Sequence, residues 1–313
     1  MRQGHTITEN HPVISLLYLV MLALGGAITF SAIGVAVGAL IYGLPENLLT
    51  GGTNLTQANE LGFMKILQIF SSAGLFLLPP LVLARIESKN PMQWLKFNNS
   101  LSSVLILLIL VLMLAGNPVL ELIVELNKAM KLPEFLRDVE SWMLAKEKQM
   151  EILTKQLLVM KDWKDLSINL LMIAVLPAIS EELFFRGCVQ RLFTKWVKNY
   201  HVGIWITAII FSSIHIQFYG FFPRMFLGAL FGYLLIWTGN IWYPIIAHFV
   251  NNGVTVVAAY AYQRQGKSLD EFETATQAGW PVYVGSAVIL TGLLIFFRKS
   301  ALKLQEKNEA GLD

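Results

Sequence analysis

The chain has 313 residues, of which 55% are hydrophobic and only 14% are charged, and its mean hydropathy is +0.56. That apolar content exceeds what a soluble globular domain needs, so the sequence predicts an all-α, polytopic membrane protein. The single cysteine, Cys188, excludes an intrachain disulfide and a cysteine-based metal cluster. Because the chain has no glycine-rich phosphate loop, no aromatic and basic RNA signature and no low-complexity run, we expect no nucleic-acid partner.

Eight apolar segments are long enough to cross, or nearly cross, about 30 Å of hydrocarbon. They cover residues 13–42, 62–84, 101–116, 166–185, 202–219, 225–238, 241–260 and 281–297. The first is too long for the apolar region of a signal peptide, so we expect a retained span. The sixth is short and lies only a few residues before the seventh, so we predict that these two form a re-folded hairpin.

The distribution of lysine and arginine predicts the orientation of the spans. Short loops that would share one side of the membrane hold most of the basic residues: Arg85, Lys89, Lys96, Arg186, Arg191, Lys195, Lys198, Arg298, Lys299, Lys303 and Lys307. The short loops of the other side hold only Arg224, Arg264 and Lys267. The positive-inside rule therefore predicts a multi-pass protein with both termini in the cytoplasm.

Four regions follow from this pattern. They are an N-terminal three-helix membrane segment (1–116), a charged insert (117–165), a membrane core (166–260), and a C-terminal membrane helix with a cytoplasmic tail (261–313). In the insert, apolar residues recur at heptad-like spacing at Met143, Met150, Leu153, Leu157 and Met160, which predicts an amphipathic helix between the third and fourth spans. We interpret it as a solvated face over an apolar stripe. The alternative is a substrate-recruiting or dimerising element.

Two adjacent glutamates and an arginine interrupt the apolar sequence of the fourth span. A carboxylate inside a membrane costs at least about 2.5 kcal/mol, so such residues indicate a functional site. Glu182 and Arg186 are four residues apart and share a helical face, which predicts an ion pair. Glu181 should point elsewhere, without a local cation, as a carboxylate available as a base would. The alternative is that both acids lie at a helix end in headgroup water.

Polar residues also interrupt two later segments. His215 ends F-S-S-I-H (211–215) and is predicted to lie well inside the fifth span, whereas His248 and Asn252, in H-F-V-N-N (248–252), share one face of the seventh. Asn251 is expected to face another way. A glutamate, two histidines and an asparagine supply a base, a group that positions water, and donors for an oxyanion. These are the parts of a hydrolase that cleaves an amide without a covalent intermediate.

The same side chains also suit a divalent metal. Imidazole and carboxylate are zinc ligands, so Glu181, His215 and His248 are the candidate ligands if a metal is present. The zinc-protease motif H-E-x-x-H is absent, and the amide of Asn252 is a poor zinc ligand. The sequence favours water activation without metal and leaves the cofactor open.

Three motifs occur in order. E-E-L-F-F-R (181–186) matches E-E-x-x-x-R, F-S-S-I-H matches F-x-x-x-H, and H-F-V-N-N matches H-x-x-x-N. The set resembles the CAAX-protease and bacteriocin-processing (CPBP, or Abi) family of intramembrane proteases, which includes the type II CAAX prenyl endopeptidases, over about residues 165–260. That resemblance implies a role for each site residue: Glu181 activates water, His215 holds it, His248 and Asn252 form the oxyanion site, and Glu182, Arg186 and Phe211 give structural support. Periodicity alone would place Phe211 in the core.

The leading hypothesis is an intramembrane endopeptidase that hydrolyses a peptide bond of a membrane-associated protein or peptide. The alternative is a non-catalytic scaffold or transporter whose intramembrane polar residues bind an ion or stabilise helix packing. Both hypotheses place the chain in a lipid bilayer. Neither identifies the substrate, a prenylated tail, the metal dependence or the oligomeric state.

Overall fold

The computed structural model describes residues 9–45, 58–98, 101–271 and 278–309, and every regular element within these ranges is helical. Seven of the described helices are long and apolar enough to cross a membrane: Pro12–Tyr42, Asn59–Glu87, Ser103–Lys128, Trp163–Val197, Phe221–Thr238, Trp242–Arg264 and Trp280–Lys307. Tyr200–Ser213 is a shorter apolar helix. The protein is therefore an all-α, multi-pass membrane protein, as the composition predicts.

The elements follow one another without a strand in the described ranges. The α-helices are α1 (Pro12–Tyr42), α3 (Ala58–Ser72), α4 (Leu78–Glu87), α5 (Pro91–Trp94), α6 (Ser103–Lys128), α7 (Arg137–Leu157), α8 (Trp163–Asn169), α9 (Leu176–Glu182), α10 (Arg191–Val197), α11 (Tyr200–Ser213), α12 (Phe221–Thr238), α13 (Trp242–Arg264) and α15 (Trp280–Glu309). Wider π-helical turns form η1 (Ala73–Leu77), η3 (Leu170–Val175) and η4 (Leu183–Gln190), and a short 3-10 turn, η2 (Glu134–Leu136), precedes α7.

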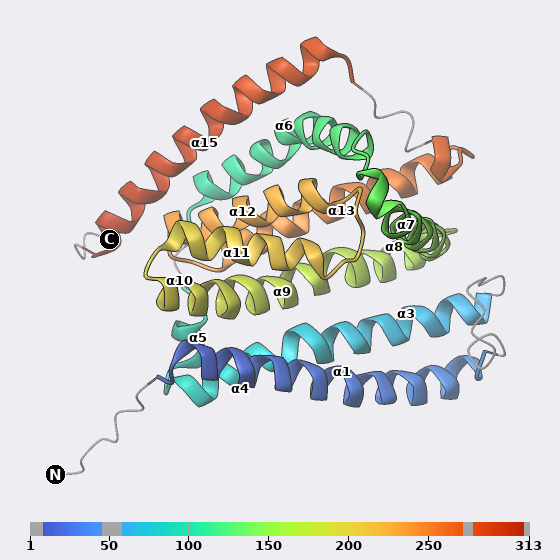
Figure 1. The fold of residues 1–313 in the computed structure, drawn as a ribbon, viewed down its shortest axis with the longest axis horizontal. Helices are drawn as coiled ribbons and strands as arrows, with labels where there is room; N and C mark the ends of the chain where they lie inside the picture. Colours follow the sequence, from blue (N-terminus) through green and yellow to red (C-terminus); the bar gives the residue numbers. More distant parts are fainter. Residues whose placement is uncertain (1–8, 46–57, 99–100, 272–277, 310–313) are drawn as a thin grey trace.

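The spans pack in layers (Figure 1). α1 lies against α3, η1 and α4 on one side of the molecule, and α6 pairs with α15 on the other. Between them lies the long helix from α8 to α10, together with α11, α12 and α13. One apolar cluster joins the first layer to the middle of the molecule, and a second joins α6 and α15 to α12 and α13. The middle layer is therefore covered on both sides.

Prolines explain two of the π-helical segments. Pro79 and Pro80 lie in the first turn of α4, and Pro177 lies in the first turn of α9. A proline has no N–H, and its ring clashes with the carbonyl four residues earlier, so the turn before it widens. Leu78 and Leu176 accordingly donate to carbonyls five residues back. The carbonyl opposite Pro177 is thereby released from the helix ladder.

Three predicted boundaries were wrong. α6 continues to Lys128, so residues 117–128 belong to the third span and not to the insert. α11 ends at Ser213, so His215 lies in the turn after this helix and not well inside a span. α12 begins at Phe221 and is long enough to cross a membrane, so the pair that it forms with α13 is not shortened. Charge composition misplaced the first boundary because α6 remains helical after its apolar sequence ends.

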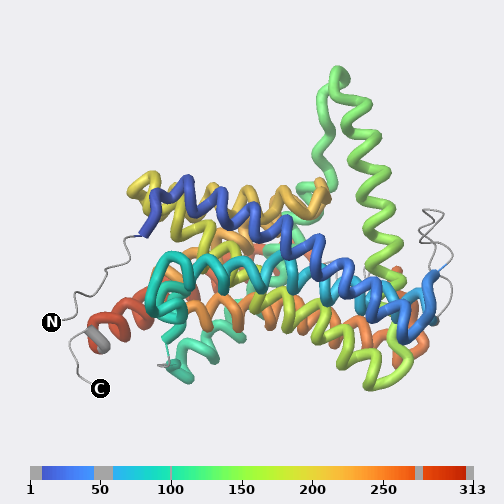
Figure 2. Tube along the Cα trace, turned by 90° about the horizontal axis from the view of Figure 1, so that it is seen from below, coloured from blue at the N-terminus to red at the C-terminus, as the bar shows by residue number. Residues whose placement is uncertain are grey.

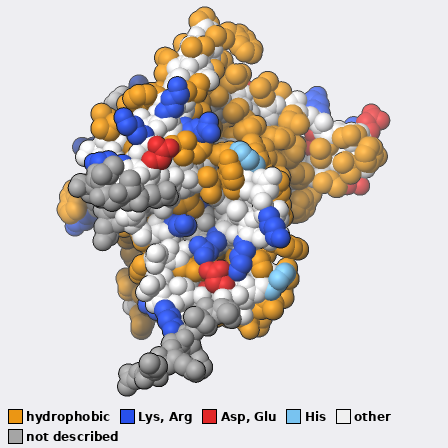
Figure 3. Space-filling model, turned by 90° about the vertical axis from the view of Figure 1, so that its left-hand side faces the viewer, with side chains coloured by type: hydrophobic (Ala, Val, Ile, Leu, Met, Phe, Trp, Pro, Cys, Tyr) orange, Lys and Arg blue, Asp and Glu red, His pale blue; other side chains and the backbone are white. Residues whose placement is uncertain are grey.

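The basic residues predicted to share a side lie at one end of the bundle, except Arg186, which was wrongly placed in a loop and is buried in η4. In Figure 1 this end holds α4, α5, α10, the first turns of α1 and the last turns of α15. Figure 3 views it directly, and lysine and arginine side chains are spread over it. Glu9 ties the start of the chain to α10 through Arg191 at 2.7 Å and Lys195 at 2.9 Å. The start of α1 and the end of α15 therefore lie on the same side of the bundle.

The amphipathic helix of the insert is α7, and it lies across the direction of the spans. It is seen nearly end-on in Figure 1, whereas in Figure 2 it projects away from the bundle. Its second half is held to the body by Glu147, which accepts from the Tyr219 N–H at 3.1 Å, and by Lys155, which pairs with Asp270 at 2.6 Å. A helix in this orientation is suited to lie in a membrane interface.

α1 and η1 approach each other closely at Gly26 and Gly74. A Cβ at Gly26 would lie less than 3.0 Å from the Gly74 backbone, whereas a Cβ at the neighbouring Gly25 would meet nothing within 4 Å. We expect Gly26→Ala to force the helices apart and to destabilise the fold by about 1–3 kcal/mol. Gly25→Ala is the matched control, and it should be neutral or slightly stabilising because alanine favours helix. Thermal unfolding of both variants in detergent measures this, and equal melting temperatures would contradict it.

Candidate active site

The centre of the site is the carboxylate of Glu182, whose side chain is fully buried. Its Oε1 accepts from Arg186 Nη1 at 2.6 Å, so the predicted ion pair is present. The same oxygen lies 2.8 Å from Nδ1 of His248, which comes from α13. An ionised carboxylate only accepts hydrogen bonds, so Nδ1 of His248 carries the hydrogen. Glu182 thus fixes the orientation of the histidine and leaves its Nε2 for the site.

Arg186 completes this buried chain of charges. Its Nη2 donates to the Gly228 carbonyl at 3.0 Å, and its guanidinium lies over the rings of Phe211 at 4.8 Å and Phe231 at 5.3 Å. The phenylalanines therefore supply two ring faces to a cation that has no access to water. Phe231 also stacks on the ring of His248, with centroids 5.3 Å apart. Both ends of the Arg186–Glu182–His248 chain are packed between aromatic rings.

A glycine pair on α12 allows this arrangement. Gly228 and Gly232 are four residues apart and face the long helix, where Arg186 and Gln190 donate to their carbonyls at 3.0 and 3.2 Å. A Cβ at Gly232 would lie 2.5 Å from the Gln190 Oε1. Small residues at this spacing let membrane helices approach closely. The G-x-x-x-G spacing is visible in the sequence, but its role as a support of the site was missed.

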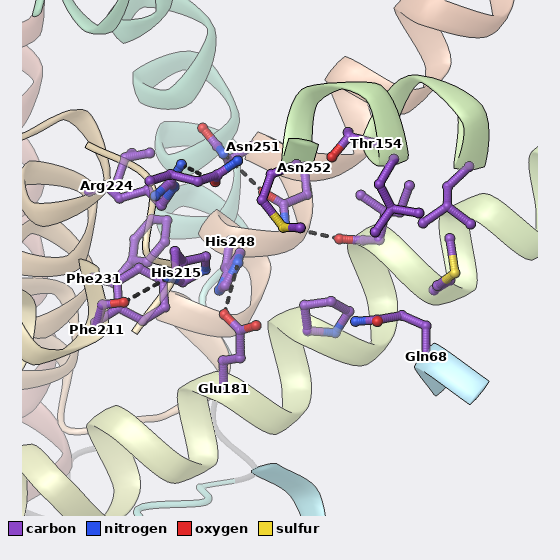
Figure 4. Close-up of a pocket in the computed structure, with 18 residues that line it drawn as sticks. Gln68, Thr154, Glu181, Phe211, His215, Arg224, Phe231, His248, Asn251 and Asn252 are labelled. Atoms are coloured by element: carbon purple, nitrogen blue, oxygen red, sulfur yellow. Dashed lines mark hydrogen bonds and ion pairs between the residues drawn. The ribbon is translucent and has the colours of Figure 1, made fainter. Parts of the chain in front are cut away.

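Glu181 faces the opposite way, into a cavity of about 510 Å³ (Figure 4). Its Oε2 lies 3.9 Å from Nε2 of His248, and its side chain keeps an exposed fraction of 13%. The expectation that Glu181 points away from the ion pair is thus met in the structure, although His248, distant in sequence, lies near it. Two adjacent carboxylates therefore occupy different environments, one bonded to a cation and the other bordering open space.

His215 reaches the cavity from the turn after α11. Its Nδ1 lies 2.8 Å from the Phe211 carbonyl, and because a carbonyl only accepts, Nδ1 carries the hydrogen and Nε2 is an acceptor in the neutral ring. Ile216 has φ of +51°, a conformation that is strained for a β-branched residue. Two further bonds hold the turn, from the Ser212 hydroxyl to the Phe221 carbonyl at 2.6 Å and from Arg224 to Gln217 at 2.5 Å.

Asn252 borders the cavity but is partly committed to the fold. Its Nδ2 donates at 2.9 Å to the Ile173 carbonyl, the group released by Pro177 four residues later. One N–H of this amide remains for a ligand. Asn251 was expected to face another way, yet it lines the same cavity and donates to the Asn252 Oδ1 at 3.0 Å. The expectation was wrong because the cavity is wide enough to border two adjacent positions of α13.

Further residues that the motifs did not indicate also line the cavity. Arg224, at the start of α12, borders it, and its Nη1 has no hydrogen-bond partner among the described residues. Gln68 of α3 lies across from Glu181 (Figure 4). Met150, Leu153 and Leu157, three positions of the apolar stripe, line the cavity from α7. The stripe was visible in the sequence, but periodicity alone does not say what it packs against.

The metal hypothesis does not fit the geometry of the candidate ligands. In the part of the chain that the structure describes, no group of three or more His, Cys, Asp or Glu side chains is arranged to hold a metal ion. Glu181, His215 and His248 all border the cavity, and the Nδ1 bonds of both imidazoles leave Nε2 free, but the three side chains do not converge as a metal-binding group. No catalytic step is therefore derived through a metal.

Comparison with known proteins supports the motif analysis. Residues 163–254 match the family model described as type II CAAX prenyl endopeptidase Rce1-like. This confirms the resemblance predicted from the three motifs, all of which lie inside the matched segment. The uncharacterized protein YpbD of Bacillus subtilis (strain 168) is 29% identical over 90 residues, which are 28% of this chain and 43% of that protein. The chain thus spans less than half of the curated relative it matches. No solved structure matches the chain.

The buried charge chain generates a second prediction. We expect Arg186→Ala to lower the free energy of unfolding by about 3–5 kcal/mol, because it leaves the carboxylate of Glu182 buried without its cation. Arg298→Ala, at an exposed arginine of α15, is the control and should change stability little. Thermal unfolding and folded yield measure the difference. If Arg186→Ala melted like the wild type, Glu182 would not depend on the ion pair.

Proposed function

We propose that the protein is an intramembrane endopeptidase that uses Glu181 to activate water. The observation that carries this proposal is the contrast between two adjacent glutamates. Glu182 is bonded to Arg186 and His248, whereas Glu181 borders the cavity with only a 3.9 Å contact to His248. A pair of carboxylates in different environments is the usual arrangement for separating a base from an orienting group. The match of residues 163–254 to the Rce1-like model supports the same reaction class.

The proposed reaction is a direct attack of water on the peptide carbonyl. Glu181 takes one proton as the water oxygen bonds to the carbonyl carbon, and the neutral His215 accepts a second hydrogen bond through Nε2. The carbonyl π electrons move to oxygen and give a tetrahedral intermediate. When the C–N bond breaks, the proton held by Glu181 passes to the leaving nitrogen. The products are a carboxylic acid and an amine, and no covalent enzyme intermediate forms.

The negative charge of that intermediate requires donors on the same side of the cavity. Nε2 of His248 is a donor when the ring carries a hydrogen on each nitrogen. The remaining N–H of Asn252 is a second donor. Arg224, with its unpartnered Nη1, is a third. Such preorganised donors in a site of low water content supply much of the rate enhancement of acyl-transfer enzymes.

The orientation of the protein bears on access to this site. We propose, from the positive-inside rule, that the basic end with both termini faces the cytoplasm. α7 lies at the other end of the bundle (Figure 1), and its second half covers the cavity. Phe135, just before α7, and Trp142, in its projecting half, are exposed apolar side chains. They suit α7 to the membrane interface. A membrane-associated substrate would then reach Glu181 beneath α7.

A non-catalytic scaffold or transporter is the competing function. It accounts for the Arg186–Glu182–His248 chain as a packing element, but it assigns no role to a separate carboxylate beside an open cavity. An ion-binding site would need several side chains to converge on one point. The described residues include no group of three or more His, Cys, Asp or Glu side chains arranged to hold a metal ion. A hydrolase gives a role to this separate carboxylate as well as to the buried charge chain.

The central test is Glu181→Gln. We expect it to reduce peptide release from membranes by at least about 100-fold, because general base catalysis contributes roughly that much, while thermal stability stays close to that of the wild type. Glu140→Gln, at a half-buried position of α7 outside the cavity, is the matched control and should remain active. Profiling of released peptides measures both. Unchanged release from Glu181→Gln would disprove the proposed base, and ion flux that survives the change would favour a transporter.

Contact between α7 and the substrate is tested by shortening Leu153, one of the α7 side chains that line the cavity. We expect Leu153→Ala to raise KM by about tenfold with little change in kcat, because it removes apolar contact area without touching the reacting groups. Leu144→Ala, in the exposed part of the same helix, is the control for a general effect on α7. Steady-state kinetics on a substrate found by the peptide profile measure both. Equal KM values for the two variants would show that α7 does not contact substrate.

A further inference from the structure

A second cavity, of about 370 Å³, lies on the other face of the long helix, at the basic end of the bundle. It is lined by residues of α10, η4, α12 and α15 and by the loop after α5: Lys96, Arg186, Gly187, Gln190, Arg191, Thr194, Lys195, Leu235, Ile236, Gly239 and Gln305. Every charged residue in this lining is a cation. It shares Arg186 with the active-site network, but it contains none of the residues to which we assign a chemical step.

The charges around this cavity do not cancel. Arg186 is balanced by Glu182. Lys96, Arg191 and Lys195 line the rim, and the Glu9 carboxylate bonds to Arg191 and Lys195. Burial raises the pKa of Glu9, but the hydrogen bonds from Lys195 and Arg191 outweigh it and lower the pKa below its usual value, so this carboxylate is ionised at neutral pH. The three cations at the rim thus outnumber the carboxylate that bonds to two of them.

Two residues that line the same cavity, Gln190 and Thr194, carry buried oxygens without partners among the described residues. Gln190 is 2% exposed and uses its Nε2 for the Gly232 carbonyl, while its Oε1 has no hydrogen-bond partner among the described residues. The Thr194 hydroxyl, one turn further along, is also unpartnered there. An unsatisfied buried oxygen destabilises a fold unless a ligand or water supplies a donor. The cavity therefore combines cations at its rim with an acceptor and a hydroxyl in its wall.

We propose that this cavity binds the phosphate group of an anionic molecule that also carries a hydroxyl. The phosphate would lie among Lys96, Arg191 and Lys195, and the hydroxyl would donate to the Gln190 Oε1. A phosphatidylglycerol headgroup has this chemistry, and so has soluble glycerol 3-phosphate. Basic pockets between membrane helices are common sites for acidic headgroups, and each basic side chain near a membrane surface strengthens such binding.

The test uses full-length protein, stripped of lipid in detergent. Native mass spectrometry measures the retention of phosphatidylglycerol and of phosphatidylcholine, and thermal unfolding is followed with each lipid and with glycerol 3-phosphate. We expect phosphatidylglycerol to be retained in preference to phosphatidylcholine and to raise the melting temperature. A comparable rise with glycerol 3-phosphate would identify a soluble phosphate as ligand, whereas a rise with the lipid alone would identify the headgroup. Equal retention of both lipids, without a rise for either anion, would overturn the proposal.

Charge-removing variants locate the binding. We expect Lys96→Gln with Lys195→Gln to weaken phosphatidylglycerol binding by about thirtyfold. Lys89→Gln with Lys303→Gln removes two charges from exposed positions of the same end outside the cavity, and it should weaken binding by less than about threefold. If the first double variant unfolds without lipid, Lys96→Gln alone, at an exposed rim residue, replaces it with an expected fivefold loss. Equal losses in the rim and control variants would place the lipid elsewhere and overturn the proposal.

Discussion

The rest of the structure depends on the contacts made by the buried carboxylate of Glu182. One buried oxygen accepts from Arg186 and from His248, so the fourth span and α13 are tied at a point that water does not reach. A single buried charge is unfavourable in a membrane, and here it is balanced, bonded and enclosed by aromatic rings. Because Glu182 makes the contacts that stabilise the fold, the neighbouring Glu181 can border a cavity.

Irregular helix geometry places the other polar groups. Pro177 widens the helix before α9 and leaves the Ile173 carbonyl without a helical partner. The Asn252 side chain donates a hydrogen bond to this carbonyl. The end of α11 and the strained Ile216 turn His215 back toward the bundle. Both departures from an ideal helix would be unfavourable in lipid unless partners were supplied, and the site residues supply some of them. The hydrogen bonds that stabilise the fold and those that arrange the site are thus partly the same.

The two faces of the long helix have different environments. One borders the cavity with Glu181, covered by α7, and the other borders the basic cavity at the opposite end. Arg186 contributes to the lining of the basic cavity and also bonds to Glu182, so it is the physical link between them. An ionic ligand near Arg186 would act on the orientation of His248 through a single intervening carboxylate.

The sequence alone was sufficient for the class of fold, the pairing of Glu182 with Arg186 and the resemblance to intramembrane proteases, because these depend on composition and on spacings within one helix. The three motifs taken together also indicated Glu181, His215, His248 and Asn252, which all line one cavity in the structure. Only the tertiary structure could show that Glu182 bonds to His248, that Asn252 bonds to the Ile173 carbonyl and that the apolar stripe of α7 lines the cavity. These contacts join residues far apart in the chain, so spacing within one helix does not predict them. The boundary of α6 and the orientation of Asn251 were predicted wrongly for a related reason: helix ends and cavity walls depend on what packs beside them, and periodicity does not record that.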